Sequence, residues 1–237
     1  MALPIVETPR YECTLASQDM QVQYRPFLVK EEKILLVAME SKDNNEIINA
    51  TKQVIQACTY NKIDVDKLPM FDIEYLLLQI RAKSVGEISK FKVVCPDDKQ
   101  TVTDVELDLS TVEVQVEDDH TNKIVIDEKR NLGLVLNYPS LGITKAGFDV
   151  NKTDSDSMFN VICSCIDHIY EGDKVYPAKD STQKELKDFL ESITQKAFLD
   201  IKKFFETAPQ LRHEVEVTNP KTGVKSKVTF KGLQDFF

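Results

Sequence analysis

Glycine is scarce in this sequence, with 7 glycines among 237 residues. A phosphate-binding loop needs glycine, because backbone N–H groups must approach the phosphate closely. The motifs of serine hydrolases, zinc peptidases and paired Cys-x-x-Cys zinc sites are also absent from the sequence. The chain is therefore expected to be non-enzymatic and to bind no cofactor.

Positive charge is also in deficit. The formal net charge is -9 and the isoelectric point is near 5.0, whereas a protein that binds nucleic acid presents a basic surface to the phosphates. The longest apolar runs, ILLV and YLLLQI, are far shorter than the roughly 20 residues that cross a bilayer. The N-terminal MALPIVETPRYE has neither the basic nor the apolar region of a secretory signal. We expect a cytoplasmic protein that binds no nucleic acid, membrane or small-molecule substrate.

The cysteines lack the spacing of a disulfide framework and are odd in number, which indicates reduced thiols. A zinc site at Cys163, Cys165 and His168 is the most specific metal hypothesis. Two helical residues two positions apart point about 200° apart, however, so both thiols cannot face one ion. Cys95 begins a Cys-x-x-Asp sequence in which Asp98 stands where a second thiol is needed. We therefore predict core cysteines, a β-turn after Cys95 and no metal site.

Residues 1–87 form the first predicted domain, a β-hairpin over 10–27 followed by three amphipathic helices. The first helix has a predicted apolar stripe, and its charged residues, Glu31 among them, are assigned to the solvent side. Asp72 is predicted to cap the third helix. The apolar stripe of the first helix consists of Ile34, Leu35, Ala38 and Met39.

Residues 88–140 form the second predicted domain, because apolar and polar residues alternate with period 2. This alternation predicts an antiparallel β-meander with one buried face and one solvated face. The outer face is expected to be acidic and either solvated or a docking surface for a basic partner. The acidic residues assigned to it are Asp104, Glu106, Asp108, Glu113 and Glu117.

Residues 141–237 form the third predicted domain, a helical segment with a final β-hairpin. A first helix, capped by Asp154 or Ser155, is predicted to run to about Gly172, and a second opens with a Thr182–Glu185 capping box. The terminal Phe236 and Phe237 either fold back onto the core or anchor in a partner. The predicted fold class is α+β: N-terminal hairpin and helical block, antiparallel β-meander, and C-terminal helical segment ending in a β-hairpin.

Four stretches of the sequence are informative together, and they are PRYEC (9–13), RPFLVKEEKILLVAME (25–40), LPMFDIEYLLLQIRAKSVGE (68–87) and, more weakly, FKGLQDFF (230–237). These stretches resemble the baseplate hub assembly proteins of T-even-like contractile-tailed bacteriophages. The resemblance implies a viral protein that helps to build the tail baseplate hub, with other hub or tail proteins as partners. It implies a location in the host cytoplasm during assembly or in the virion tail baseplate, and it carries over no catalytic residue.

Two alternatives remain open from the sequence. The chain could be a transient assembly chaperone that is absent from the mature virion, because a chaperone and a permanent subunit need the same kind of surface. In a different class, it could be a metal-dependent hydrolase whose site is assembled from the scattered residues His168, Glu171 and Asp173.

Overall fold

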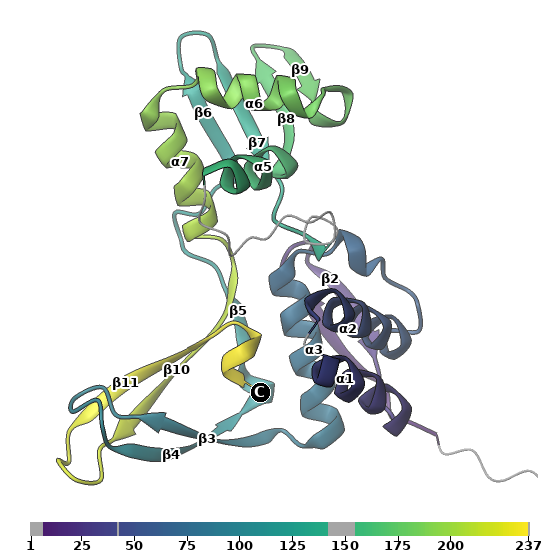
Figure 1. Ribbon diagram of the computed structural model, residues 1–237, viewed down its shortest axis with the longest axis vertical. Coiled ribbons are helices and arrows are strands. Elements are labelled where there is room, and N and C mark those ends of the chain that lie inside the picture. The colour runs from purple at the N-terminus through teal and green to yellow at the C-terminus, as the bar shows by residue number, and fades with distance from the viewer. Residues whose placement is uncertain (1–6, 42, 142–154, 237) are drawn as a thin grey trace, which may run out of the picture. The chain divides into compact units, whose positions relative to one another are not determined.

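Two neighbouring strands, β5 (Glu113–Gln115) and β10 (Gln210–Thr218), enclose a long insertion. In the computed structural model, which describes residues 7–41, 43–141 and 155–236, these strands are antiparallel and Gln115 pairs with Gln210. The chain between them, Val116–Pro209, is one compact unit, called unit 2 here, and the residues before and after it form unit 1 (Figure 1). Unit 2 therefore takes the place of a hairpin loop in unit 1, a site at which inserted domains are tolerated.

The first part of unit 1 is the predicted hairpin with three helices, and its α3 is buried on almost every side. Leu76 and Ile80 face one way and Leu78 and Ala82 another, yet all four are buried. A helix can bury every face only when other elements cover it all round. The elements are β1 (Tyr11–Leu15), β2 (Met20–Tyr24), α1 (Val29–Ser41), α2 (Asn44–Cys58), a 3-10 turn (Val65–Lys67) and α3 (Met70–Val85).

Asp72 does not cap α3, contrary to the prediction. Pro69 holds the N-cap position, and no side chain caps this end of the helix. The buried carboxylate of Asp72 instead accepts hydrogen bonds from the turn of the β1–β2 hairpin, through the N–H of Ala16 (3.0 Å) and the hydroxyl of Ser17. Asp72 thus joins the hairpin to α3.

The second part of unit 1 contains two long hairpins that share a core with α3. Phe91 of one hairpin packs edge-on against Phe230 of the other, with ring centroids 5.2 Å apart. Their turns also meet, because Asp97 accepts hydrogen bonds from Asn219 Nδ2 (3.0 Å) and from Thr222 Oγ1 (2.6 Å). The elements are β3 (Ile88–Val94), β4 (Val102–Asp108), a 3-10 turn (Leu109–Thr111), β5, β10, β11 (Lys225–Lys231) and a final 3-10 turn (Leu233–Phe236).

The strands predicted to form one meander over 88–140 are divided among three sheets. β3 and β4 form a two-stranded sheet, β5 joins β10 and β11, and the last two strands belong to a four-stranded sheet. The two units therefore do not coincide with the segments 1–87, 88–140 and 141–237. The reason is the pairing of β5 with β10, since β5 lies in the second segment and β10 in the third.

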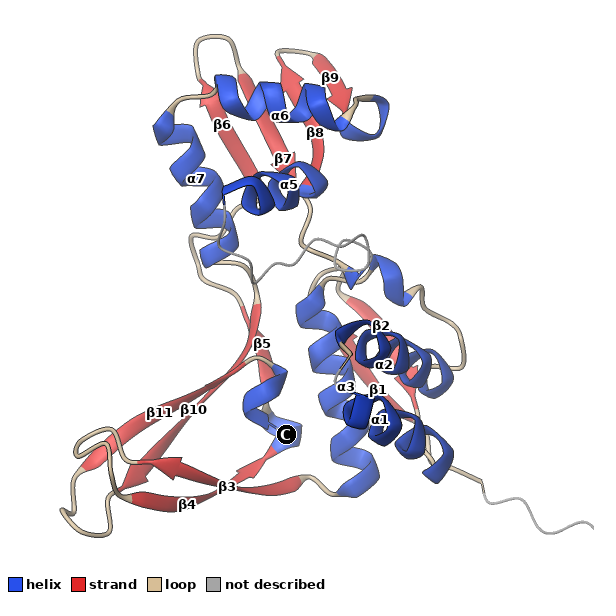
Figure 2. Ribbon diagram, viewed as in Figure 1, coloured by secondary structure: helices blue, strands red, loops and turns tan. Residues whose placement is uncertain are grey.

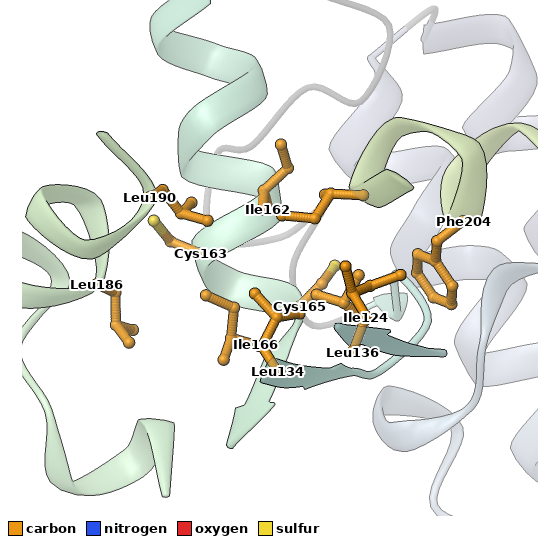
Figure 3. Close-up of a cluster of buried hydrophobic side chains, with 11 residues drawn as sticks. Ile124, Leu134, Leu136, Ile162, Cys163, Cys165, Ile166, Leu186, Leu190 and Phe204 are labelled. Carbon is orange, nitrogen blue, oxygen red and sulfur yellow. The ribbon is translucent and has the colours of Figure 1, made fainter. Parts of the chain in front are cut away.

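Unit 2 is an antiparallel sheet in the order β6-β7-β8-β9 with helices packed on it (Figure 2). Its core joins Leu134, Ile162, Leu190 and Phe204 from a strand and three helices (Figure 3). The elements are β6 (Lys123–Asp127), β7 (Leu132–Leu136), α5 (Ser155–Cys165), β8 (Ile166–Glu171), β9 (Lys174–Pro177), a 3-10 turn (Ala178–Asp180), α6 (Gln183–Ser192) and α7 (Gln195–Glu206).

The predicted helix up to Gly172 is wrong in its second half. The helix ends at Cys165, and the chain continues directly as β8, which pairs with β7 and β9. Gly172 adopts a φ of +58° in the tight turn to β9, a conformation that costs glycine little. The capping box of Thr182 and Glu185 is confirmed at the start of α6. Of the two predicted caps of the preceding helix, Asp154 lies outside the described residues and Ser155 is the first residue of α5. The predicted α+β class is confirmed.

Candidate interaction surface

Helix α1 is fixed to unit 1 at its first turn through Glu31. This residue was assigned to the solvent side, but it is only 2% exposed. Its carboxylate accepts hydrogen bonds from Arg25 Nη2 (3.0 Å) and from the N–H of Leu28 (2.7 Å). Burial alone raises a carboxyl pKa, but the bonds from Arg25 and Leu28 outweigh it, so the pKa of Glu31 is lowered. Glu31 is therefore a buried anion paired with a cation.

This anchor sets which side of α1 faces the protein. Ala38, seven residues after Glu31, lies on the same face of the helix and is buried. Met39, predicted in the buried stripe, is exposed instead. Three other apolar side chains of α1 are also more than half exposed, and they are Val29, Leu36 and Val37. Exposed apolar side chains that lie together on a surface mark interaction sites.

A shallow apolar groove of about 400 Å³ runs between α1 and α2. Buried Ala38 and Ala50 contribute small side chains to it, so the two helices leave a hollow between them. The helices are connected after Ser41, so Glu46 lies toward the connection and Lys33 lies away from it. The groove has an acidic end and a basic end, and a complementary helix fits this arrangement.

The β3–β4 hairpin does not present the acidic face that the sequence indicated. Lys90 lies opposite Glu106 in the strand register, and Lys92 lies opposite Asp104. Lys90 Nζ is 2.7 Å from Glu106 Oε1, and this bond lowers the pKa of Glu106. The prediction failed because each strand was considered alone, whereas the compensating charge lies on the neighbouring strand.

The other predicted acidic residues do not complete a single face. Asp108 accepts hydrogen bonds from the N–H and hydroxyl of Ser110 (2.9 and 2.6 Å) in the turn after β4. Glu113 lies on β5, in a different sheet, opposite Arg212. Glu117 belongs to unit 2. The five carboxylates are therefore distributed over separate structures.

The C-terminal aromatic residue that the structure describes is turned inward. Phe236 is fully buried against Phe230 and Leu78 in the core of unit 1, so of the two alternatives for this side chain the structure shows packing on its own core. Phe237 lies outside the described residues. Phe236 stabilises the fold and has no exposed surface to offer a partner.

The residues of the hydrolase alternative are not brought together. His168 and Glu171 are three positions apart on β8 and point to opposite faces of the sheet. Glu171 binds Arg130 (2.6 Å), and His168 contacts Asp167 (2.7 Å). Among residues 7–41, 43–141 and 155–236, no group of three histidine, cysteine or acidic residues could hold a metal ion.

The two free cysteines of α5 lie in the core of unit 2. Cys163 and Cys165 pack among leucine and isoleucine side chains (Figure 3), as predicted for core residues. Burial raises the pKa of the Cys165 thiol to about 12, so this thiol is protonated near neutral pH.

A polar contact that the sequence did not predict joins the start and the end of unit 2. His120 Nδ1 lies 2.8 Å from Thr207 Oγ1, and His120 Nε2 lies 2.9 Å from the Tyr138 hydroxyl. Thr207 donates its hydroxyl proton to the carbonyl of Lys203, so its oxygen accepts from His120 and the proton lies on Nδ1. Burial lowers the pKa of His120, although Asp119 and Glu117 act in the opposite direction. The neutral ring therefore holds the two ends of unit 2 together, a structural role that one histidine in a polar loop does not reveal.

A shallow hollow of about 720 Å³ in unit 2 lies between β6 and α7, and its rim carries charges of both signs. Lys203 and Asp119 on this rim form an ion pair with each other. The α1–α2 groove is apolar, whereas the rim of this hollow is charged, so the geometry favours the α1–α2 surface as the site.

In the part of the chain that the structure describes, no helix is long and apolar enough to cross a membrane.

The model of a family described as T4 bacteriophage base plate protein matches residues 8–237, which is nearly the whole chain and includes both units. No curated protein and no solved structure matches the chain.

Proposed function

Since the chain belongs to the T4 bacteriophage base plate protein family, we propose that it is a non-enzymatic protein that helps to assemble the hub of the tail baseplate. Family membership gives the chain a structural or assembly role at the phage baseplate, with other baseplate proteins as partners. The hub as the place of action is our proposal. It is supported by the likeness of residues 25–40 and 68–87 to hub assembly proteins.

The observation that carries a contact-based mechanism is the exposed apolar face of α1. Leu36 is 55% exposed beside the apolar groove, although α1 is held firmly by the buried pair of Glu31 and Arg25. A rigid helix that presents apolar side chains to solvent can bury them on association without first becoming ordered. Asp104 and Glu106 remain a second proposed contact region. Because lysines lie opposite them, this region is less favourable for steering a basic protein.

Capture from infected cells tests the proposal. A tagged chain produced during infection is expected to copurify with baseplate hub proteins, identified by mass spectrometry. Leu36→Glu should abolish this copurification, because a charge then enters the apolar contact. The matched control is Leu199→Glu in α7, since Leu199 is also 55% exposed. Recovery of the wild-type chain without any tail protein would contradict the proposed function.

Mass spectrometry of purified virions beside infected-cell lysate separates a permanent subunit from a transient chaperone. A permanent subunit is present in both samples at a fixed ratio to the other baseplate proteins. A chaperone is present in the lysate and lost from the virion. The same surface serves in both cases, so the capture experiment does not depend on which of them applies.

A further inference from the structure

The outer face of α1 combines exposed apolar residues with unpaired charges of both signs, which are Lys33, Glu40 and Glu32. Val29, Lys33, Leu36 and Glu40 follow one another at spacings of four, three and four residues, so they form a single stripe along the helix. Val37 lies next to this stripe and also lines the groove with α2. All five residues are exposed. In the described part of the chain, no ion pair involves Lys33 or Glu40.

The order of these residues is complementary to itself when reversed. Lys33 and Glu40 are equally distant from the point between Leu36 and Val37, which is the centre of the apolar segment. A second α1 helix laid antiparallel across that point places its Glu40 beside Lys33 and its Lys33 beside Glu40. It also places apolar side chains against Leu36 and Val37. A two-fold symmetric interface requires this reciprocity, in which each residue meets its counterpart twice.

The groove between α1 and α2 also fits a second α1 helix that lies antiparallel to the first. Glu46 stands at its acidic end and Lys33 at its basic end, so the opposite charges of a reversed second helix again face them. Ala38 and Ala50 in the groove let a partner helix approach closely. Two helical hairpins that meet in this way form a four-helix arrangement, a common means of burying apolar helix faces.

We infer that the α1–α2 surface binds the same surface of a second copy of this chain, with α1 antiparallel to α1 about a two-fold axis near Leu36 and Val37. This inference rests on the proposed function only in that both use the α1 surface. It names a second copy of this chain as the occupant of that surface, so the loss of copurification expected for Leu36→Glu follows from the loss of the dimer. The apolar centre supplies the burial, and the two Lys33–Glu40 pairs set the direction of the helices.

Analytical ultracentrifugation of the full chain over a range of concentrations tests the inference. The wild-type chain is expected to form a dimer that dissociates on dilution. Leu36→Glu is expected to weaken the dimer at least about tenfold, whereas the equally exposed Leu199→Glu leaves it unchanged. Circular dichroism of each variant shows whether the fold is retained.

Charge reversal gives a sharper test, because the two charges act between copies. Lys33→Glu alone and Glu40→Lys alone should each weaken self-association, since like charges then face each other. A mixture of the two single variants should form a heterodimer, in which a glutamate of one chain faces a lysine of the other at both contacts. The doubly changed K33E/E40K chain should dimerise as the wild type does. Two residues seven positions apart on a helix do not contact each other, so repair within one chain cannot imitate this result.

Each outcome decides the inference. A wild-type chain that is monomeric at every concentration overturns it, and so does a dimer that is insensitive to Leu36→Glu. A monomeric chain that still copurifies with baseplate proteins through Leu36 shows that the face binds another protein, and then the proposed function stands while this inference fails. A dimer that is sensitive to both charge reversals, together with no recovery of tail proteins from infected cells, leaves this inference standing without the proposed function.

Discussion

Helices α1 and α3 lie in the same unit and have similar proportions of apolar residues, but they expose them very differently. In α3, Leu76, Leu78 and Ile80 are fully buried. In α1, Leu36 and Val37 are more than half exposed. α3 is covered by the N-terminal elements and by the core of the two long hairpins, whereas α1 lies at the edge and contacts chiefly α2. Position in the fold, rather than apolar content, decides which helix is available to a partner.

Each of these helices carries a buried carboxylate as its third residue, and the two carboxyl pKa values shift in opposite directions. Glu31 in α1 has Arg25 beside it, and its pKa is lowered. Burial raises the pKa of Asp72 in α3, although hydrogen bonds from Ser17 and Ala16 oppose the rise. A cationic partner thus outweighs burial in one helix, and hydrogen bonds from neutral groups do not outweigh it in the other.

The largest expected effect is at Glu31. Glu31→Ala should lower the free energy of unfolding by about 3–5 kcal/mol, because it leaves the largely covered guanidinium of Arg25 without its carboxylate partner. Urea unfolding followed by circular dichroism measures the change. Glu32→Ala is the matched control, since Glu32 is exposed and its loss should change stability by no more than about 0.5 kcal/mol. Equal effects of the two substitutions would show that α1 is not held by this ion pair.

Leu78→Ala is the next largest, with an expected loss of about 2–5 kcal/mol. Leu78 is fully buried on the side of α3 that faces the two hairpins, so the substitution leaves a cavity. The same urea titration measures the loss. A loss below about 1 kcal/mol would mean that α3 is covered on one side only, as the sequence had indicated.

Asp72→Asn is expected to change stability by about 1 kcal/mol or less at neutral pH, because an amide oxygen can still accept from Ala16. Its dependence on pH is more informative. The pKa of Asp72 is raised in the folded protein above the usual 3.8, so its contribution is greatest below that value and is lost as pH rises through the folded pKa. The wild type should therefore gain stability relative to Asp72→Asn as pH falls.

Glu31→Gln should give the opposite pH dependence. The pKa of Glu31 is lowered below 4.5 in the folded protein, so its contribution is present above 4.5 and is lost as pH falls through the folded pKa. The wild type should lose stability relative to Glu31→Gln over that range. Urea titrations of both variants across acidic pH provide the measurement. Slopes of the same sign in the two comparisons would contradict the assignment of opposite shifts.

Local patterns were sufficient to predict the elements formed by neighbouring residues. The N-terminal hairpin, the three helices up to Val85 and the capping box of Thr182 and Glu185 could all be derived from the sequence. The run YLLLQI also indicates that the third helix is buried on all sides, since adjacent leucines cannot share one face of a helix. β8 was mistaken for helix because Ile166, Ile169 and Tyr170 are spaced as on one face of a helix, although the EGDK turn after it is typical of a hairpin.

Contacts between distant residues could not be predicted in the same way. The pairing of Gln115 with Gln210 turns residues 116–209 into an insertion, and no local pattern in either strand indicates its partner. The same limit applies to the candidate surface. Leu36 became a candidate only when the bond between Arg25 and Glu31 showed which side of α1 is buried.

The smallest expected effect on stability is that of Leu36→Ala, which should change the free energy of unfolding by no more than about 0.5 kcal/mol. The side chain is 55% exposed, so its removal leaves no cavity and the loss appears instead in binding to a partner. Leu199→Ala is the control with equal exposure, and urea unfolding beside sedimentation analysis measures both quantities. A loss of stability comparable with that of Leu78→Ala would show that Leu36 lies in the core of this chain. The contrast between α1 and α3 would then disappear, because an apolar residue that is buried in its own fold is not available to a second protein.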